Sequence, residues 1–150
     1  MQVGTNVRKL AAVLVACGLS ALSGQTLGAS ATESWPAASA LPRAEGKATV
    51  LMFVLGTDPR SEAKVAQLAA IVATSHQQPF VAVVHVADSQ PGTLWDASGK
   101  VPHAARLLDK GGVEAHRFNA TETGFVVVYD ARGTLEYSGS ADQLFGVLAR

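Results

Sequence analysis

Apolar and polar positions follow two different patterns along residues 48–88. Continuous apolar runs, ATVLMFVL at 48–55 and FVAVVHVAD at 80–88, predict strands that are covered on both faces. Between them, residues 61–75 carry apolar side chains at helical spacing. A buried strand, an amphipathic helix and a second buried strand predict a parallel β-α-β unit. The apolar helix positions are Val65, Leu68, Ala69 and Val72.

The second half of the chain predicts shorter elements that end in an antiparallel pair. In chain order they are a loop at 89–103 with a short helix around Trp95, a strand at 105–109, a short helix at 112–120, strands at 124–130 and 134–139, and a helix at 140–150. The two last strands are joined by DARG, which places Gly133 where a hairpin loop needs a positive φ. We therefore expect an α/β domain with a mixed central sheet and helices on both faces.

The sequence pattern of the N-terminal segment predicts a signal for export and not a part of the folded domain. Arg8 and Lys9 precede the short apolar stretch 10–22, an arrangement typical of a secretory signal peptide. The stretch is shorter than the roughly 20 apolar residues of a membrane-spanning helix. Cleavage after the ASA at 29–31 would release a periplasmic or extracellular protein, so we assign 1–31 to a signal peptide.

A second way of processing involves Cys17, the single cysteine of the sequence. LVAC at 14–17 is similar to a bacterial lipobox, which would leave Cys17 lipidated at the new N-terminus and the protein attached to the membrane. An uncleaved anchor is the third alternative. In each case Cys17 lies outside the folded domain, so we expect no thiol, disulfide or thiolate metal site there.

The remaining sequence consists of a lead-in at 32–47 and one domain at 48–150. The lead-in has two prolines and small residues, and its Trp35 is expected to pack on the domain as an anchor. Hydrophobic residues make up 48% of the chain, charged residues 16%, and the formal net charge is zero. This composition supports a globular core and does not favour a nucleic-acid partner.

The order of elements and the stretch 111–139 resemble the thioredoxin-like superfamily, and more narrowly the RedB-type redoxins of bacterial envelopes. The resemblance implies a thioredoxin-like fold over about residues 35–140. The matching positions of the second half are Glu114, Ala115, Arg117, Phe118, Asn119, Ala120, Thr121, Glu122, Thr123, Gly124, Val128, Tyr129, Asp130, Gly133, Ser138 and Gly139.

The active-site motif implied by this resemblance is altered in the present chain. The family's motif after the first strand is His-Pro-x-Cys-Pro-Cys-Ser-x-Ala, and here the aligned residues are LGTDPRSEA at 55–63. Asp58 and Arg60 take the two cysteine positions, while Pro59 and Ser61 persist. Thioredoxins place a cis-proline opposite this site, where the present chain has Thr123-Gly124. The resemblance therefore implies the fold but not the redox activity.

The altered motif has a structural and a functional interpretation. Asp58 followed by Pro59 predicts a helix start with Asp58 as N-cap and Pro59 at the first helical position. Alternatively, Arg60 and the free N–H groups could bind a small anion or a peptide carboxylate, although Asp58 already occupies that positive end. Glu62 lies one helix turn after Asp58, and this carboxylate pair predicts capping rather than acid–base chemistry.

The other titratable residues give no catalytic or metal-binding pattern. His76, His85, His103 and His116 lack paired metal spacing, and His85 is expected to be a hydrogen-bonded core residue. Ser61 lacks the Gly-x-Ser-x-Gly context of a nucleophile. We therefore expect no catalytic residue, no cofactor and no metal.

Three interpretations of function remain from the sequence. The first is a non-catalytic thioredoxin-like module of the bacterial envelope that binds protein or peptide partners. The second is an enzyme, either a redox protein whose thiols come from a partner or a different chemistry that uses Asp58 and Arg60. The third is a degenerate redoxin paralogue without retained activity.

Overall fold

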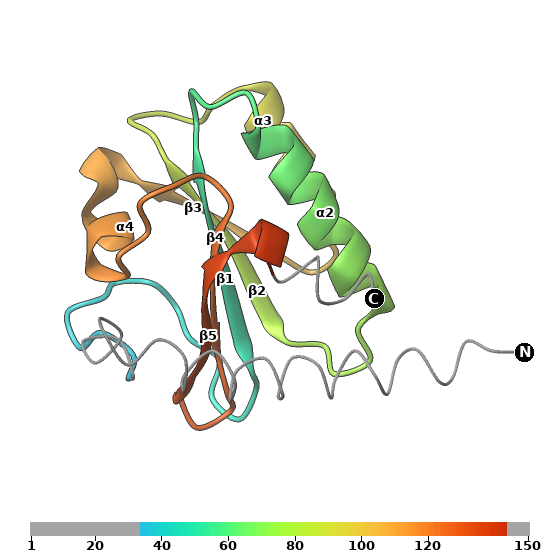
Figure 1. Cartoon of the computed structure of the whole chain (residues 1–150), viewed down its shortest axis with the longest axis vertical. Helices are drawn as coiled ribbons and strands as arrows, with labels where there is room; N and C mark the ends of the chain where they lie inside the picture. Colours follow the sequence, from blue (N-terminus) through green and yellow to red (C-terminus); the bar gives the residue numbers. More distant parts are fainter. Residues whose placement is uncertain (1–33, 144–150) are drawn as a thin grey trace, which may run out of the picture.

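The computed structural model describes residues 34–143 and contains a five-stranded mixed sheet with helices on both faces (Figure 1). The strands are β1 (Thr49–Leu55), β2 (Phe80–Val86), β3 (Ala105–Asp109), β4 (Phe125–Tyr129) and β5 (Leu135–Ser140), in the spatial order β3-β2-β1-β4-β5. β1, β2 and β3 are parallel, whereas β4 is antiparallel to both β1 and β5. This is the predicted fold class, and the order places β1 at the centre of the sheet.

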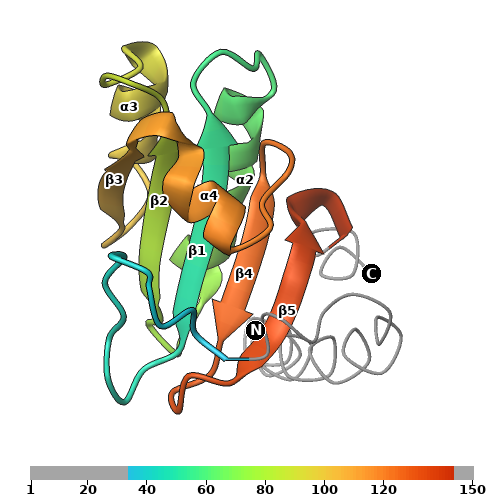
Figure 2. The ribbon, with the colours of Figure 1, turned by 90° about the vertical axis from the view of Figure 1, so that its left-hand side faces the viewer.

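The helices are α2 (Ser61–Thr74), α3 (Thr93–Ser98) and α4 (Val113–Arg117), and the short 3₁₀ helix η2 (Lys110–Gly112) leads into α4. α2 and α3 follow β1 and β2 and cover one face of the sheet, and α4 crosses the other face (Figures 1 and 2). The β1–α2–β2 unit is the crossover that the sequence predicts. Both loops that leave β1 and β2 therefore open at the same end of the sheet, at the top of Figure 1.

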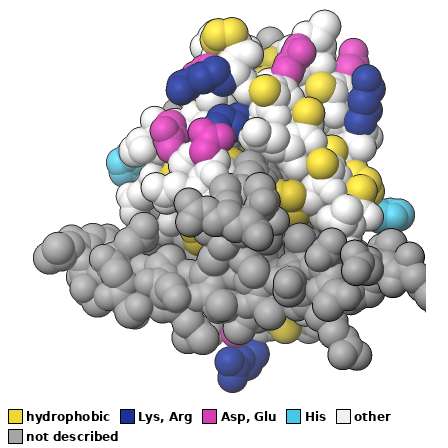
Figure 3. All heavy atoms as spheres, turned by 45° about the vertical axis from the view of Figure 1, so that its right-hand side comes forward, with side chains coloured by type: hydrophobic (Ala, Val, Ile, Leu, Met, Phe, Trp, Pro, Cys, Tyr) yellow, Lys and Arg dark blue, Asp and Glu magenta, His cyan; other side chains and the backbone are white. Residues whose placement is uncertain are grey.

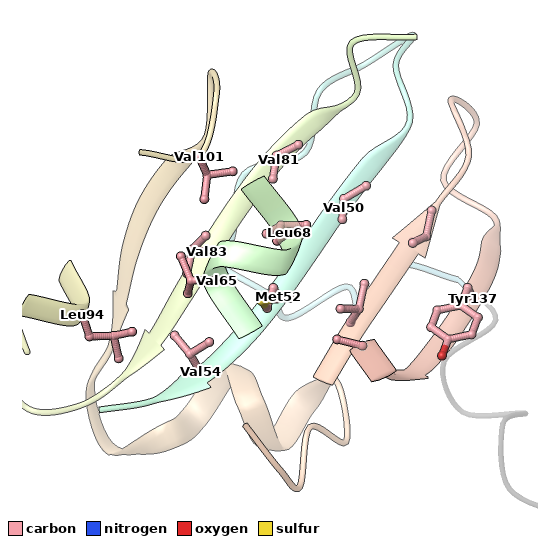
Figure 4. Packing of buried hydrophobic residues seen from close by; sticks show 13 residues of the cluster. Val50, Met52, Val54, Val65, Leu68, Val81, Val83, Leu94, Val101 and Tyr137 are labelled. Carbon is pink, nitrogen blue, oxygen red and sulfur yellow. The ribbon is translucent and has the colours of Figure 1, made fainter. Parts of the chain in front are cut away.

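The buried core has two layers because the strand side chains alternate between the faces of the sheet. On the α2 face, Val65 and Leu68 of the helix pack against the apolar side chains of the central strands (Figure 4). On the α4 face, Phe118 packs with Phe53 and Tyr129. The continuous apolar run at 48–55 thus reflects a strand that is buried on both sides, as predicted.

The lead-in docks on the α4 face of the domain (Figure 2). Trp35 meets Phe118 and Tyr129 edge-on, with ring centroids 5.2 Å apart in both pairs. The buried carboxylate of Glu114 accepts hydrogen bonds from the Ser39 hydroxyl at 2.7 Å and the Ala40 N–H at 3.1 Å, and it pairs with Arg117. The expectation that Trp35 is an anchor is confirmed.

Several element boundaries differ from the sequence-based ones. β2 ends at Val86 rather than residue 88. α4 is confined to Val113–Arg117, because Gly111 and Gly112 have positive φ directly before it and Asn119 has φ 56° just after it. The hairpin between β4 and β5 has Gly133 at φ 85°, as predicted. Ser140 still belongs to β5 rather than to the helix predicted at 140–150, and residues 141–143 are helical. Residues 144–150 lie outside the described residues, as do Cys17 and the predicted signal peptide.

Candidate functional site

The candidate site is the junction between β1 and α2, the position where the thioredoxin resemblance places the redox motif. The chain leaves the sheet at Leu55 and passes through Gly56 close to the loop that follows β2. A Cβ atom on Gly56 would lie 3.2 Å from the Cβ atoms of Ala87 and Pro91, so a larger residue would push the two loops apart. Figure 3 shows side chains of both charge signs gathered at this upper end of the molecule.

Asp58 and Arg60 form a closed ion pair in the middle of the junction. The Asp58 carboxylate accepts hydrogen bonds from the Arg60 backbone N–H at 2.9 Å, from Nε at 3.1 Å and from a terminal guanidinium nitrogen at 2.8 Å. These hydrogen bonds from the Arg60 side chain and backbone lower the pKa of Asp58 to about 2. The carboxylate is therefore ionised throughout the physiological range and is poorly suited to general acid or base catalysis near pH 7.

The predicted role of Asp58 as N-cap of the helix is wrong in detail. α2 begins at Ser61, and its N-cap residue is Arg60, which makes no side-chain cap hydrogen bond. The Ser61 N–H instead donates to the Asp58 carbonyl at 3.1 Å, which closes a turn one step before the helix. Asp58 stabilises this turn because its carboxylate accepts the Arg60 N–H. Pro59 is exposed within the turn.

Ser61 and Thr123 meet in a buried hydrogen-bond network. Their hydroxyl oxygens lie 2.6 Å apart, although the residues are 62 positions apart in the sequence. The Ser61 hydroxyl donates to the Leu55 carbonyl at 2.7 Å, and the Leu55 N–H donates to Thr123 Oγ1 at 3.0 Å. Since Ser61 has one proton to give, Thr123 must donate to Ser61. The altered motif and the turn before β4 therefore lie side by side, as the resemblance implies. Their contact is a buried hydrogen-bond network that joins the two segments.

Gly124 and Lys64 form the adjoining wall of the site. Gly124 has φ 80°, and a Cβ atom there would lie 2.7 Å from Lys64 Cδ. The Gly124 N–H donates to the Phe53 carbonyl and its carbonyl accepts from the Ala141 N–H, both at 2.8 Å. The buried Lys64 side chain ends in an ion pair with Asp142. Gly124 thus allows the lysine stem to cross the backbone and reach its partner.

Lys64 is a site residue that the sequence analysis missed. The signal was present, because Lys64 lies three positions after Ser61 and four before Leu68, and both of these are buried on the inner face of α2. A lysine at such a position predicts a buried stem with a paired ammonium group. Asp142, its partner, follows β5 and could not be identified from spacing alone.

His85 confirms the prediction of a hydrogen-bonded core histidine. It is fully buried on β2 beneath α3, and its Nε2 atom lies 2.9 Å from Ser98 Oγ. The Ser98 hydroxyl donates to the Trp95 carbonyl at 2.7 Å, so His85 Nε2–H must be the donor to Ser98. Burial is the main cause that lowers the pKa of His85 to about 4, and the charge of Arg106 adds to it. His85 is therefore neutral at physiological pH.

Neither a metal-binding cluster nor a membrane-spanning helix is found among the described residues. Within 34–143, no three histidine, cysteine, aspartate or glutamate side chains are grouped in a way that could hold a metal ion. Over the same residues, no helix has both the length and the apolar character needed to cross a membrane.

We predict that removing either hydroxyl of the Ser61–Thr123 pair destabilises the domain. Ser61→Ala or Thr123→Val should each lower the free energy of unfolding by about 1–3 kcal/mol, because each leaves a buried backbone or hydroxyl group without its partner. The double variant should cost less than the two single costs together, since both hydroxyls belong to one network. Urea unfolding of the four proteins measures these values.

Thr74→Ala is the matched control for the Ser61–Thr123 pair. Its hydroxyl donates to the Ile71 carbonyl within α2 on an exposed surface, so its loss should change stability by less than about 0.5 kcal/mol. Additive costs in the double variant would mean that the two hydroxyls do not share a network.

Comparison with known proteins identifies the fold. No family model matches the chain, and no curated protein matches it. Among solved structures, a secreted disulfide oxidoreductase of Mycobacterium tuberculosis, described as homologous to Escherichia coli DsbE, matches with a TM-score of 0.52 and 24% identity over 70% of this chain and 82% of its own.

Two further structures agree with this match. A thioredoxin-like protein from Aeropyrum pernix has a TM-score of 0.57 and 15% identity over 87% of this chain and 96% of its own. StoA from Bacillus subtilis has a TM-score of 0.52 and 17% identity over 69% and 84%. At these identities the matches establish the fold, which is thioredoxin-like.

Proposed function

We propose that this chain is a non-catalytic thioredoxin-like module of the bacterial envelope that binds protein or peptide partners. The observation that carries the proposal is that the β1–α2 junction has an ion pair where the family has two cysteines. The groups in the two cysteine positions are the carboxylate and guanidinium of one closed ion pair. Neither of them can form a disulfide or exchange electrons with one.

The neighbouring polar groups of the site support the same interpretation. The hydroxyl of Ser61 is buried and fully used within the network with Leu55 and Thr123. A serine that already donates to a backbone carbonyl lacks the adjacent base that activates a nucleophile. Residues 34–143 contain no cysteine, so a thiol reaction at this site would need sulfur from outside the domain.

A narrower assignment, to the RedB-type redoxins with replaced cysteines, is part of the proposal. It is supported by the resemblance of residues 111–139 and by the thioredoxin-like fold. Export is supported by the charged and apolar pattern of residues 1–31, and one structural neighbour is described as secreted. We propose processing before Thr32, with lipidation of Cys17 as the alternative.

The proposed binding surface consists of the exposed residues around the junction. Thr57, Pro59 and Arg60 lie on one side, and Glu122 lies on the other. Arg60 and Glu122 directly precede Ser61 and Thr123, whose hydroxyl oxygens lie 2.6 Å apart, so the two exposed side chains belong to neighbouring loops. Peptide recognition by such a surface would combine backbone contacts with charge complementarity.

A photo-crosslinking experiment tests this surface. We expect a benzophenone amino acid at position 122 to form adducts of defined mass in bacterial envelope extract. The matched control is position 132, because Arg132 is 87% exposed and lies in the β4–β5 hairpin at the opposite end of the sheet. Equal adducts from both positions, or none from position 122, would favour a degenerate paralogue without a partner.

A further inference from the structure

A cleft of about 740 Å³ lies at the end of the sheet opposite to the β1–α2 junction. It is bordered by the end of the lead-in, the C-terminal end of α2, the residues that enter β2, and Pro102-His103 before β3. α2 ends and β2 begins at the bottom of Figure 1, away from the loop that carries Asp58. The volume is within the range of about 300–1,000 Å³ for small-molecule sites.

The walls of the cleft combine apolar surface with hydrogen-bonding groups. Val72, Pro79, Phe80 and Pro102 supply aliphatic and aromatic surface, and Phe80 is only partly buried by the core. Apolar walls with a few polar groups are the usual composition of small-molecule sites. The walls suit a compact ligand with an apolar ring or chain.

Two nitrogen-bearing side chains of the cleft form no ion pair with a carboxylate of residues 34–143. The ion pairs formed among residues 34–143 involve neither Lys47 nor His103, and both side chains are exposed. Glu45 is the one acidic residue on the cleft wall. Lys47 also borders a neighbouring hollow of about 370 Å³ that is lined by two acidic residues, Asp130 and Glu136. The Asp130 carboxylate accepts hydrogen bonds from the Arg132 and Thr134 N–H groups, and neither carboxylate forms an ion pair with Lys47 among residues 34–143. The Lys47 ammonium group is therefore available to an anionic ligand.

Two residues that line the cleft have an unusual backbone conformation. Three non-glycine residues among those described have positive φ, and two of them, Gln78 at 43° and His103 at 56°, line this cleft. The third, Asn119, follows α4, where asparagine commonly adopts this conformation. Strained residues that persist in a structure are concentrated at ligand sites, because the strain positions a side chain there.

From these observations we propose that the cleft binds a small hydrophobic carboxylate, with the apolar body against Phe80 and Pro102 and the carboxylate on Lys47 and His103. The site is separate from the β1–α2 junction and does not depend on the function proposed for that surface. Charge-assisted hydrogen bonds from the two side chains supply the preference for an anion.

Phenylacetate is a suitable probe, with 2-phenylethanol as its neutral analogue. In a titration of the full chain followed by ¹H–¹⁵N NMR, phenylacetate should produce saturable shifts at the amides of Gln78, Phe80 and His103. Lys47→Gln should weaken phenylacetate binding about tenfold and leave 2-phenylethanol binding unchanged, because only the anion uses the ammonium group. Lys100→Gln, an exposed lysine outside the cleft, should leave both affinities unchanged.

His103→Gly provides an independent test that does not rely on Lys47. It removes the imidazole but accepts the positive φ, so the protein should be at least as stable as the parent while binding phenylacetate more weakly. The proposal is overturned if the phenylacetate shifts do not saturate or if they map to another surface. It is also overturned if Lys47→Gln weakens the acid and the alcohol equally, or if His103→Gly binds phenylacetate as well as the parent does.

Discussion

The free energy of unfolding should fall by about 3 kcal/mol as the pH is lowered from 6.5 to 4, because His85 is buried in its neutral form. Its pKa changes from 6.5 in the unfolded chain to about 4 in the folded one. The unfolded state therefore binds a proton first, so the contribution is complete above pH 6.5 and is lost as the pH falls through this window. Urea unfolding at fixed temperature across this range measures the slope.

His85→Gln should abolish most of this slope while keeping an N–H donor for Ser98. The matched control is His116→Gln, which removes an exposed histidine in place of the buried one. Burial acts to raise the pKa values of Glu114 and Asp130, but their hydrogen bonds together outweigh it and lower both, so these carboxylates lose their contributions mainly at lower pH. The raised pKa of Glu136, caused mainly by burial, gives a small opposite trend. A flat profile between pH 6.5 and 4 in the parent protein would contradict the burial of neutral His85.

Gly124→Ala should destabilise the domain by about 2–4 kcal/mol. About 1–2 kcal/mol comes from placing alanine at φ 80°, and the rest comes from the collision of its Cβ atom with the Lys64 stem 2.7 Å away. Displacement of this stem would also weaken the ion pair with Asp142. Urea unfolding against the parent protein measures the cost.

Gly46→Ala is the matched control for this substitution, because Gly46 has φ 73° but no atom within 4 Å of the place that an alanine methyl group would take. It should show the backbone cost alone, about 1–2 kcal/mol. The difference between the two variants measures the contact between Gly124 and Lys64. Equal costs would mean that the lysine stem moves freely and does not form a wall of the site.

The parts of the fold that sequence could predict are those set by local pattern. The run at 48–55 and the helical spacing at 61–75 identify β1 and α2 because burial on two faces or on one face leaves different periodicities. Gly133 marks the β4–β5 hairpin because the loop needs a positive φ. The resemblance then supplied the topology, which the strand order confirms.

The parts that sequence could not predict depend on contacts between distant residues. Ser61 and Thr123 are separated by 62 positions, and their hydrogen bond depends on how β4 lies beside β1. The prediction of Asp58 as N-cap was wrong because its carboxylate binds both the backbone N–H and the guanidinium of Arg60 before the helix begins. His85 could be expected to have a hydrogen-bond partner, but Ser98 can be identified as that partner only from the packing of α3 over β2.

The measurement that tests the central claim most directly is the reduction of insulin disulfides in the presence of dithiothreitol, with the full chain and its Cys17→Ala variant. Both proteins should match a heat-inactivated control, because neither Asp58 nor Arg60 can exchange electrons with a disulfide and residues 34–143 contain no cysteine. Turnover above that control in either protein would contradict the non-catalytic account. Turnover that is lost in Cys17→Ala would show that the cysteine takes part in the site.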